Sequence, residues 1–400
     1  MSIVVQKYGG SSVKSIEKIR KVAQTVIQRK CSGDDMIVVV SAMGDTTDQL
    51  NELAYSVTNH PDKRELDALL STGEAISSAL LAMTIKELGY DAVSYTGLQL
   101  GIRTVGDYGK ALIDDIDSGK KLIEMIKDKI VIVAGFQGVN EEGDTTTLGR
   151  GGSDTTAVAL AVKLNGICEI YTDVDGIYSV DPRTYLKAHK LDRIDYEEML
   201  ELSSLGAQVM HSRAIELGQK YQIPIYVGLS NGQNNGTIIQ EVMEMRMEEK
   251  PVTGLATSDS DVAITIMEIE NVENIVSRLF EKIASKKINI DMISQTAPIN
   301  NKIHLSFTIP KADLRECMEI IEPFLSKDHQ LVIDQNITKF SIVGMGMKTT
   351  SGVASRLLNV FCENRIGVKM ITTSEIRITC AINQENKQHA ITLVAEEFDL

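Results

Sequence analysis

Two short segments of this sequence carry residue types that bind and transfer phosphoryl groups. The first, Lys7-Tyr8-Gly9-Gly10, directly follows the apolar run Ile3-Val4-Val5. Backbone N–H groups of adjacent glycines can approach an anion closely, and a lysine beside them can supply positive charge. The segment lacks the GxxxxGK(S/T) spacing of a Walker P-loop, and a glycine pair after a strand is more often a plain turn. We therefore interpret it as a candidate phosphate cradle that needs support from elsewhere in the chain.

The second segment, Arg150-Gly151-Gly152-Ser153-Asp154, precedes an apolar helical pattern. Ser153 or Asp154 is expected to cap this helix, whose first N–H groups would attract an anion. A capped helix alone would explain neither the arginine nor the second glycine. The segment therefore favours an anion site that is flanked by an arginine and an aspartate.

Two further places have polar residues that a binding site could use. Glu74 falls in the expected first turn of a helix, where the helix dipole favours a carboxylate whatever its role. Thr172-Asp173-Val174-Asp175-Gly176-Ile177-Tyr178 and Asp181-Pro182-Arg183 follow a later strand, and they fit a turn as well as a nucleotide site. Neither place decides the chemistry alone.

The elements that must position these residues form an α/β pattern. Up to about residue 230, short β-branched runs alternate with amphipathic segments, which predicts a mainly parallel sheet covered by helices. One helix is indicated by Ile76, Leu80 and Met83, with Ser71 or Thr72 available to cap its start and Gly89 to end it. Because the strands end in glycine or short polar residues, we expect one ligand crevice at their carboxyl ends. The predicted strands are Ile3-Val4-Val5, Met36 to Val40, Ile130 to Val133, Glu169 to Tyr171 and Pro224 to Val227.

The last part of the chain repeats itself weakly. Ser277-Arg278-Leu279 recurs as Ser355-Arg356-Leu357, and the same offset pairs Met292 with Met370. Each copy has the pattern strand, helix, strand, strand, helix, which is typical of a ferredoxin-like unit. We therefore predict two such units after a charged, Met-rich boundary at residues 241–250. The pattern also permits strand exchange between the copies.

The composition excludes several function classes. The chain has 55 acidic and 41 basic residues, a net charge of −14, and no basic stretch suited to nucleic acid. Its five cysteines are far apart and form no CxxC pair, so we predict free thiols and no metal site. The start has no signal-peptide pattern, and no apolar run approaches the length of a membrane span. We therefore expect a cytoplasmic protein without nucleic-acid or membrane partners.

Taken together, these segments and Ser41-Ala42-Met43-Gly44-Asp45-Thr46-Thr47 closely resemble the aspartate kinase family of the amino-acid kinase fold. The resemblance spans essentially the whole chain and includes two ACT domains at its C-terminus. It implies a three-layer kinase domain at 1–245, with ferredoxin-like βαββαβ ACT domains at 246–335 and 336–400. It also implies phosphorylation of the L-aspartate side chain by ATP with Mg²⁺, the first step of lysine, threonine and methionine biosynthesis.

The resemblance assigns roles to individual residues. Catalytic roles fall on Lys7, Gly9, Gly10 and Asp154. Aspartate binding falls on Thr47, Glu74, Arg150, Gly151, Gly152 and Ser153. Nucleotide binding falls on Lys7, Tyr8, Gly9, Gly10, Ser41, Thr172, Asp173, Tyr178 and Arg183. No residue is assigned to a protein-bound metal, because Mg²⁺ is expected to arrive with the ATP phosphates.

The chemistry agrees with these roles. The acceptor carboxylate is already ionised at neutral pH, so no general base is required. The task is to align two anions and to stabilise the charge on the phosphoryl oxygens, which suits Lys7 and glycine amides. Arg150 can hold the α-carboxylate of aspartate in a two-pronged contact, and Glu74 can receive its ammonium group.

Family behaviour also implies feedback inhibition by lysine, threonine or both, through ACT domains that pair in a homodimer or higher oligomer. Asn289, Asp291 and Gln295 are the candidate effector ligands, because they are polar positions of an otherwise apolar strand. The sequence departs from the family pattern at Gln208 and Lys369. The nucleotide contact usual for a lysine at position 208 is therefore not carried over, and the identity of the effector stays open.

Two other functions stay open from the sequence. The same fold could phosphorylate N-acetylglutamate, glutamate or UMP, although the pairing of Glu74 with Arg150 and the ACT domains argue against it. The chain could instead be a non-catalytic amino-acid sensor, although Lys7 and Asp154 are both present. Separately, Met243, Met245 and Met247 either provide an internal start for a small subunit or belong to a linker helix.

Overall fold

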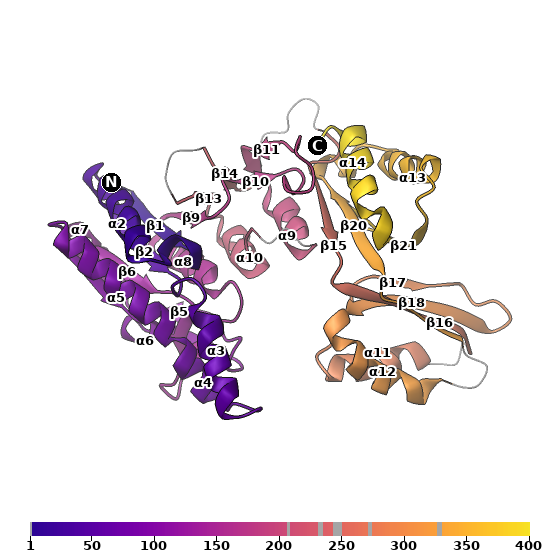
Figure 1. The fold of residues 1–400 in the computed structure, drawn as a ribbon, viewed down its shortest axis with the longest axis horizontal. Coiled ribbons are helices and arrows are strands. Elements are labelled where there is room, and N and C mark those ends of the chain that lie inside the picture. Colours follow the sequence, from indigo (N-terminus) through magenta and orange to yellow (C-terminus); the bar gives the residue numbers. More distant parts are fainter. Residues whose placement is uncertain (1, 206–208, 231–234, 243–249, 271–273, 326–329) are drawn as a thin grey trace. The chain divides into compact units, whose positions relative to one another are not determined.

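The computed structural model describes residues 2–205, 209–230, 235–242, 250–270, 274–325 and 330–400 (Figure 1). The chain forms two compact units. The first contains residues 1–177, 190–203 and 208–244, and the second contains residues 178–189, 204–207 and 245–400. The predicted domain boundary at 245–246, the cluster Met243–Met247 and Gln208 lie outside the described residues.

A mainly parallel sheet of eight strands is the centre of the first unit. Neighbouring strands run parallel, except that β13 pairs antiparallel with β14. This sheet confirms the α/β fold class, and all five predicted strands are present. Strands β1, β2 and β6 are almost wholly buried, as expected for parallel strands covered on both faces. In spatial order the strands are β12 (Arg193–Ile194), β14 (Thr237–Ile239), β13 (Ile225–Leu229), β9 (Ile167–Thr172), β1 (Ile3–Tyr8), β2 (Asp35–Val40), β6 (Ile130–Ala134) and β3 (Ala92–Tyr95).

Helices cover both faces of this sheet. α2 (Ile16–Cys31) and α5 (Thr72–Glu87) pack on one face. α7 (Gly119–Asp128) and α8 (Gly152–Leu164) pack on the other, with α10 (Ser212–Tyr221) against α8. Because successive residues of a strand point to opposite faces, Tyr8 enters the core under α2 and α5, whereas Lys7 points toward α8. This alternation decides which side chains of β1 reach a site on the α8 side.

Two predicted helix caps are wrong. α5 begins at Thr72, but Ser71 directly follows α4 (Lys63–Leu70) in a right-handed helical conformation, and its hydroxyl donates to the Ala68 carbonyl. α8 is preceded by Gly151 in the left-handed region, so Ser153 and Asp154 lie inside its first turn. A capping side chain needs an extended backbone at the N-cap, and neither helix start has one.

The stretch Lys63–Glu87, which spans α4 and α5, is long and apolar enough to cross a membrane by length and composition alone. Half of its most apolar window is nevertheless buried inside this unit. Leu81 and Ile85 of α5 pack in the core against the sheet, whereas Ile76 and Met83 are exposed. The burial of Leu81 and Ile85 identifies α5 as a core helix of the first unit.

A smaller sheet completes the first unit. Its order is β5 (Leu112–Ile116), β4 (Ile102–Val105), β7 (Gln137–Val139) and β8 (Thr145–Thr147). The buried carboxylate of Asp67 on α4 anchors it, because it accepts hydrogen bonds from the Gly109 N–H at 2.9 Å and from the Thr147 N–H and hydroxyl, each at 2.7 Å. The remaining elements up to residue 204 are α1 (Gly10–Val13), α3 (Thr46–Val57), α6 (Gly97–Leu100), β10 (Ile177–Tyr178), β11 (Lys190–Leu191) and α9 (Tyr196–Ser204).

The second unit contains two four-stranded sheets, as the sequence repeat predicts. The first sheet has the order β17 (Ile293–Gln295), β18 (Lys302–Pro310), β16 (Asp261–Glu270) and β19 (Gln330–Asp334). Helices α11 (Ile275–Ser285) and α12 (Leu314–Ile321) lie together on one side of it (Figure 1). The second sheet has the order β15 (Gly254–Ser258), β20 (Ile337–Val343), β22 (Arg377–Asn383) and β21 (Val368–Thr373), with α13 (Val353–Glu363) and α14 (Lys387–Phe398). Short 3-10 helices lie at Lys311–Asp313, Glu322–Phe324, Met345–Lys348 and Gln384–Asn386.

The two ferredoxin-like sheets are not consecutive pieces of chain. β15 precedes every strand of the first sheet, yet it pairs antiparallel with β20 and forms the edge of the second sheet. The segment 261–334, which contains the strands of the first ferredoxin-like sheet, is therefore inserted between β15 and β20. Pairing of β15 with β20 therefore completes the second sheet across the inserted segment.

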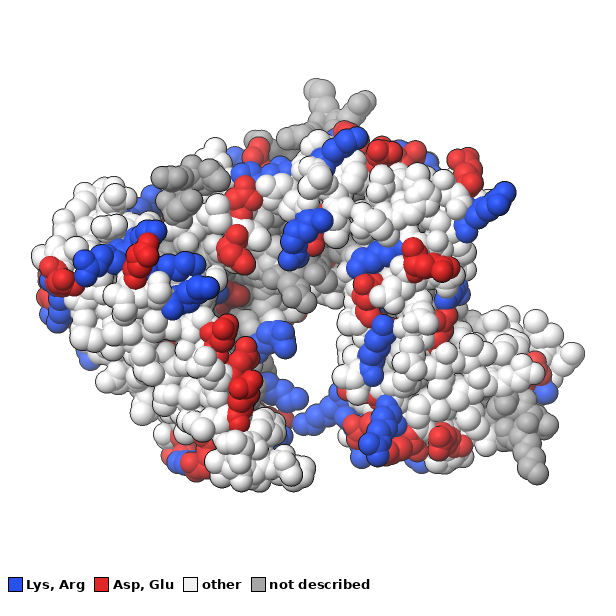
Figure 2. All heavy atoms as spheres, viewed as in Figure 1, with Lys and Arg blue, Asp and Glu red and all other residues white. Residues whose placement is uncertain are grey.

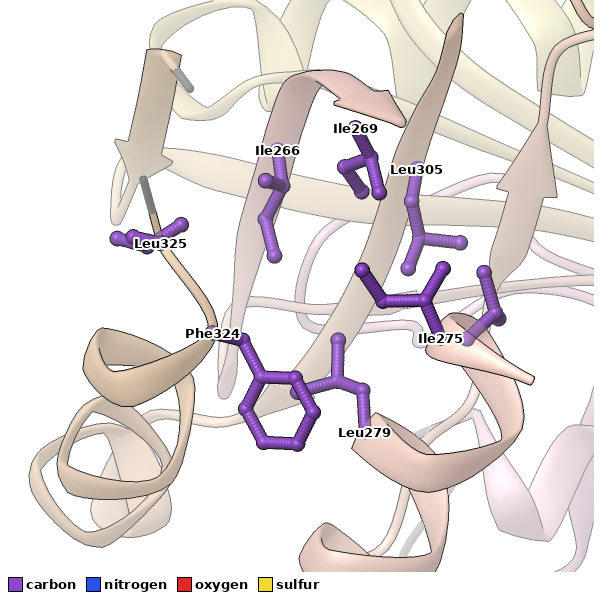
Figure 3. A pocket seen from close by; sticks show the side chains of 8 residues that line it. Ile266, Ile269, Ile275, Leu279, Leu305, Phe324 and Leu325 are labelled. Carbon is purple, nitrogen blue, oxygen red and sulfur yellow. The ribbon is translucent and has the colours of Figure 1, made fainter. Parts of the chain in front are cut away.

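A small apolar pocket lies between the first sheet and its helices (Figure 3). Ile266 and Ile269 of β16, Leu305 of β18 and Leu279 of α11 point toward it, and Phe324 closes one side. Its volume is only about 10 Å³, which is about the space of one water molecule. With no polar group among its lining residues, we interpret it as a packing gap in the core.

Charged side chains of both signs are intermixed on the visible face of each unit (Figure 2). Among the described residues that are visible, this face carries no continuous basic surface of the kind that follows the phosphates of nucleic acid.

A buried lysine joins the two sheets of the second unit. The ammonium group of Lys339 on β20 lies 3.0 Å from Asp261 on β16 and 2.6 Å from Asp291, and the lysine side chain is only 7% exposed. Apolar side chains from both sheets, including Met292 and Met370, pack together in the same contact region. The three charged groups therefore hold together two sheets that otherwise meet through apolar side chains.

Replacing this lysine should destabilise the second unit. In Lys339→Met two carboxylates lose their shared cation, so we expect a loss of about 3 kcal/mol of stability, measured by thermal unfolding. Lys302→Met is the matched control, because Lys302 pairs with Glu268 at 2.9 Å while both side chains are about 40% exposed. Equal shifts of the melting temperature in the two variants would contradict the structural role of the triad.

Candidate active site

One cleft of the first unit collects the phosphate-binding candidates. It has a volume of about 270 Å³ and lies where β1, β2 and β6 end and where α5 and α8 begin. This is the carboxyl edge of the parallel sheet, where ligands of open α/β sheets bind. The cleft is lined by Lys7, Gly10, Ser41, Ala42, Gly44, Thr47, Glu74, Phe136, Gly149, Arg150, Gly151, Gly152, Ser153 and Asp154.

An ion pair forms the floor of this cleft. Lys7 Nζ lies 2.6 Å from Asp154 Oδ1, and each side chain is 11% exposed. β1 supplies the lysine and the first turn of α8 supplies the aspartate, so the pair joins the central strand to the helix above it. Asp154 thereby orients the lysine ammonium, while the dipole of α8 adds positive potential at the same place.

Glu74 lines the cleft and has one carboxylate oxygen that is buried and unused. Its Oε1 accepts a hydrogen bond from the Ala42 N–H at 3.0 Å, and its Oε2 has no hydrogen-bond partner among the described residues. Burial raises the pKa of Glu74 to about 7, against a partial lowering by the hydrogen bond from Ala42. A buried acceptor of this kind is suited to a ligand that brings a cation.

The glycines of the second segment allow a very tight backbone. A Cβ atom on Gly151, whose φ is +68°, would lie 2.2 Å from the Cβ of His211. A Cβ on Gly152 would lie 2.9 Å from atoms of Leu148 and Phe136. Any larger residue would therefore push this turn away from its neighbours. Both glycines thus have a packing reason that is independent of phosphate binding.

Arg150 lies between these glycines and the loop before them. It is exposed at the wall of the cleft, and it forms no hydrogen bond or ion pair with the described part of the chain. Thr47 stands in the first turn of α3, and Ser41 directly follows β2. Arg150, which has no partner in the described part of the chain, and the orphan oxygen of Glu74 belong to residues of the same cleft, so the cleft has one group for an anion and one for a cation.

Several predicted site residues lie elsewhere. The side chain of Tyr8 is fully buried and stacks on Tyr171 with ring centroids 5.1 Å apart. Gly9 lies next to the cleft, but its N–H donates to the Tyr171 carbonyl at 3.2 Å. Thr172 and Asp173 follow at the end of β9, the strand beside β1, and they do not line the cleft. Tyr178 and Arg183 belong to the second unit.

The predicted effector ligands differ in their surroundings. Asn289 and Gln295 are exposed, whereas the Asp291 carboxylate accepts a hydrogen bond from Lys339 Nζ. An effector cation at Asp291 would therefore meet an aspartate that already has a partner.

Phe136 is a cleft residue that the sequence did not single out. It has a φ of +70°, which is strained for a bulky side chain, and its N–H donates to the Thr156 hydroxyl at 3.2 Å. The sequence signal that could have identified Phe136 is its position in the loop Gly135-Phe136-Gln137-Gly138, because this loop directly follows the central strand β6. Ala42, Gly44 and Gly149 also line the cleft without a chemical signature in the sequence.

A protein-bound metal ion would need a different set of donors. Within the described ranges, no three His, Cys, Asp or Glu side chains are placed to hold a metal together. In the cleft, Asp154 is paired with Lys7, and Glu74 is partly engaged by a backbone N–H. The residues present therefore fit a Mg²⁺ that is held mainly by a polyphosphate and water.

Two families match this chain. Residues 2–228 match the amino acid kinase family, and residues 256–323 and 340–398 match the ACT domain. The first match covers the eight-stranded sheet up to β13 together with the whole cleft. The second covers two segments, which contain β16, β17 and β18 of the first sheet and most of β20 with β21 and β22 of the second.

Relatives match over their full length. The aspartokinase of Bacillus sp. (strain MGA3) is 44% identical over 404 residues, covering 100% of this chain and 98% of the relative. The aspartokinase of Geobacillus stearothermophilus is 45% identical over 401 residues, with the same coverage.

Solved structures with the same fold include the aspartate kinase from Synechocystis, with a TM-score of 0.56 and 36% identity, covering 100% of this chain and 70% of that one. Another is E. coli aspartokinase III in complex with aspartate and ADP, with a TM-score of 0.80 and 22% identity, covering 99% of both chains. The second likeness supports the fold.

The raised pKa of Glu74 predicts a pH-dependent cost in stability. The folded protein holds the proton of Glu74 more tightly than the unfolded chain, whose carboxyl titrates near 4.5. The protonated Glu74 carboxyl therefore contributes its full stabilisation of the folded state below about pH 4.5. This stabilisation is lost as the pH rises through about 7 and the buried group ionises. Glu74→Gln removes this ionisation, so the variant should gain about 3 kcal/mol relative to the parent between pH 5 and 8.

Thermal unfolding of both proteins over this pH range measures the effect. Glu65→Gln is a suitable control, because Glu65 is 67% exposed and lies in the same part of the unit. If the melting temperatures of the parent and of Glu74→Gln changed equally with pH, the pKa of Glu74 would not be raised in the folded protein.

Proposed function

This chain belongs to the aspartokinases of the amino acid kinase family, and we propose that it transfers the γ-phosphoryl group of ATP to the side-chain carboxylate of L-aspartate. The products are 4-phospho-L-aspartate and ADP. The observation that carries the proposal is the combination, in one cleft, of a buried Lys7–Asp154 pair with the partnerless Glu74 oxygen and Arg150.

The reaction needs alignment and charge stabilisation more than proton transfer. The attacking carboxylate of aspartate is ionised at neutral pH, and the bond that breaks joins the γ-phosphorus to the oxygen that leaves with ADP. Lys7 meets the negative charge on the transferred phosphoryl oxygens, and Asp154 holds the lysine in place for this. Gly10 offers its N–H at the start of α1, where no intrahelical acceptor exists. The N–H of Gly9 is bonded to Tyr171, so it supports the turn instead.

Aspartate is held at its two charged backbone groups. Arg150 binds the α-carboxylate in a two-pronged contact, and Glu74 Oε2 receives the ammonium group. Thr47 and the turn at Gly151, Gly152 and Ser153 complete the substrate side. An N-acetylated acceptor has no ammonium group to bring to Glu74, so the same site would disfavour it.

ATP is the phosphoryl donor, and Mg²⁺ on its phosphates supplies part of the charge neutralisation. Among the nucleotide contacts implied by the family resemblance, Ser41 lines the cleft, and Thr172 and Asp173 follow β9 beside it. Tyr178 and Arg183 are proposed as further contacts. Asp154 is paired with Lys7, so a bound Mg²⁺ would be held mainly by the nucleotide phosphates and water.

The ACT domains serve feedback regulation by lysine, threonine or both, in a cytoplasmic homodimer or higher oligomer. The reaction is then the first step toward lysine, threonine and methionine. Asn289 and Gln295 are exposed and available to an effector, while Asp291 is already paired with Lys339. An effector ammonium at Asp291 would share or displace that lysine, which gives a differential contact between liganded and free states.

Removing the lysine of the cleft tests the proposed chemistry. Lys7→Ala should lower kcat for aspartate-dependent ADP release about 100-fold or more, because a donor to the developing charge is lost. Lys21→Ala is the matched control, since Lys21 pairs with Glu17 on the exposed face of α2. Equal rates in the parent and Lys7→Ala would rule out the assigned role of Lys7.

The ammonium contact predicts a pH profile. Glu74 binds the substrate cation only when ionised, so the KM for aspartate should fall as the pH rises through about 7. In Glu74→Gln the KM should be higher and flat over the same range. Steady-state assays between pH 6 and 9 measure this, and a profile of equal shape in both proteins would contradict the contact.

A further inference from the structure

The structure points to a support for Arg150 that lies outside the cleft. We propose that Arg213, with His211, is a positioning pair that fixes the turn 148–151 and so presents Arg150 to the α-carboxylate of aspartate. This rests on the proposed function, because it concerns the same substrate contact. Both residues stand at the start of α10, and neither lines the cleft.

Arg213 crosslinks two segments through their backbone. Its Nη1 donates to the Leu148 carbonyl at 2.5 Å and its Nη2 donates to the Ala111 carbonyl at 3.0 Å. The Ala111 N–H in turn donates to the Thr147 carbonyl at 3.0 Å. A guanidinium is a planar fork, so these two bonds fix the spacing of the two carbonyls as well as their distance from α10. Leu148 is two residues before Arg150, so the clamp acts on the start of the turn.

His211 holds the other end of the turn. Its Nδ1 accepts a hydrogen bond from the Arg213 N–H at 3.4 Å, which sets the imidazole at the N-cap of α10. The Gly151 Cα lies against this side chain, because a Cβ built there would fall 2.2 Å from the His211 Cβ. Gly149, at φ +78°, is similarly confined, since its Cβ would fall 2.9 Å from the Gly109 carbonyl oxygen.

Arg150 therefore sits between two glycines whose backbones are walled in. Its own side chain has no bond to the described part of the chain that could orient it. Its direction must come from the backbone of the turn, and that backbone is held by Arg213 and His211. Asp154 is anchored differently, through α8 and its ion pair with Lys7 on β1. Loss of Arg213 should thus disturb aspartate binding and leave the phosphoryl side of the cleft in place.

The test compares Arg213→Met and Arg213→Lys with Arg150→Gln in the full chain, by steady-state kinetics with aspartate and with ATP. Arg150→Gln should raise the KM for aspartate on the order of 10-fold or more, because a charge-assisted contact is lost. Arg213→Met should raise the same KM about 10-fold, with kcat and the KM for ATP within about 3-fold of the parent. Arg213→Lys keeps one bond and should fall between Arg213→Met and the parent.

A double variant separates positioning from simple stability. In the Arg150→Gln background, Arg213→Met should change the KM for aspartate less than about 2-fold, because the residue that it positions is already gone. Arg20→Met is the matched control: Arg20 also bridges two segments of this unit, at 3.2 Å from Glu87, and both residues are far in sequence from the turn. It should leave the KM for aspartate unchanged within about 2-fold.

Other results overturn the proposal. A lower kcat with an unchanged KM for aspartate in Arg213→Met, or full additivity with Arg150→Gln, would assign Arg213 a purely structural role. If Arg213→Met fails to fold, Arg213→Lys decides, and a parental KM for aspartate in that variant counts against positioning. An unchanged KM in Arg150→Gln itself would overturn the substrate contact under the proposed function, whereas an effect in Arg150→Gln without one in Arg213→Lys or Arg213→Met overturns only the positioning pair.

Discussion

The ion pair between Lys7 and Asp154 is the interaction on which the rest of the cleft depends. A lysine that is nearly buried at the end of a central strand is stable only beside an opposite charge, and a 2.6 Å contact provides it. The pair also fixes a distance between the sheet and the first turn of α8. The Gly149–Ser153 turn leads directly into that helix, so the same contact anchors the end of the turn that joins α8. The start of the turn is held separately, by the bond from Arg213 to the Leu148 carbonyl.

Much of the kinase half was predictable because its signals are local. β-branched runs predicted the central strands, and a ligand crevice was expected at their carboxyl ends, where the cleft lies. The helix caps predicted at Ser71 and Ser153 were wrong, because a capping residue needs an extended backbone, which depends on the preceding chain. Ser71 directly follows α4 in a helical conformation, and α8 is preceded by Gly151 in the left-handed region. Period-two alternation in β1 would have separated Lys7 from Tyr8, but the motif was treated as one block. Their opposite directions became clear only when the two faces of the sheet were known.

Residues that act through backbone atoms leave little trace in a sequence. Arg213 binds two carbonyl oxygens, and every residue has a carbonyl, so its partners Leu148 and Ala111 carry no chemical signature. Phe136 lines the cleft with its backbone at a positive φ, a conformation that is unusual for a bulky residue and could not be expected from its type. The Lys339 triad was also beyond sequence reasoning, because Lys339 on β20, Asp261 on β16 and Asp291 before β17 are far apart in the sequence and meet only in the folded unit.

That insertion has a consequence for the order in which the second unit is assembled during synthesis. β15 leaves the ribosome before the inserted segment 261–334, but its partner β20 emerges only after the last strand of that segment. Residues 261–334 contain all strands of the first sheet and can fold as soon as they are complete, whereas β15 must wait as an unpaired edge. Folding of the insert brings the ends of β15 and β20 together and so reduces the entropy cost of closing the long loop between them. A folding defect in the inserted segment would therefore appear first as a failure of β15 to pair with β20 in the second sheet.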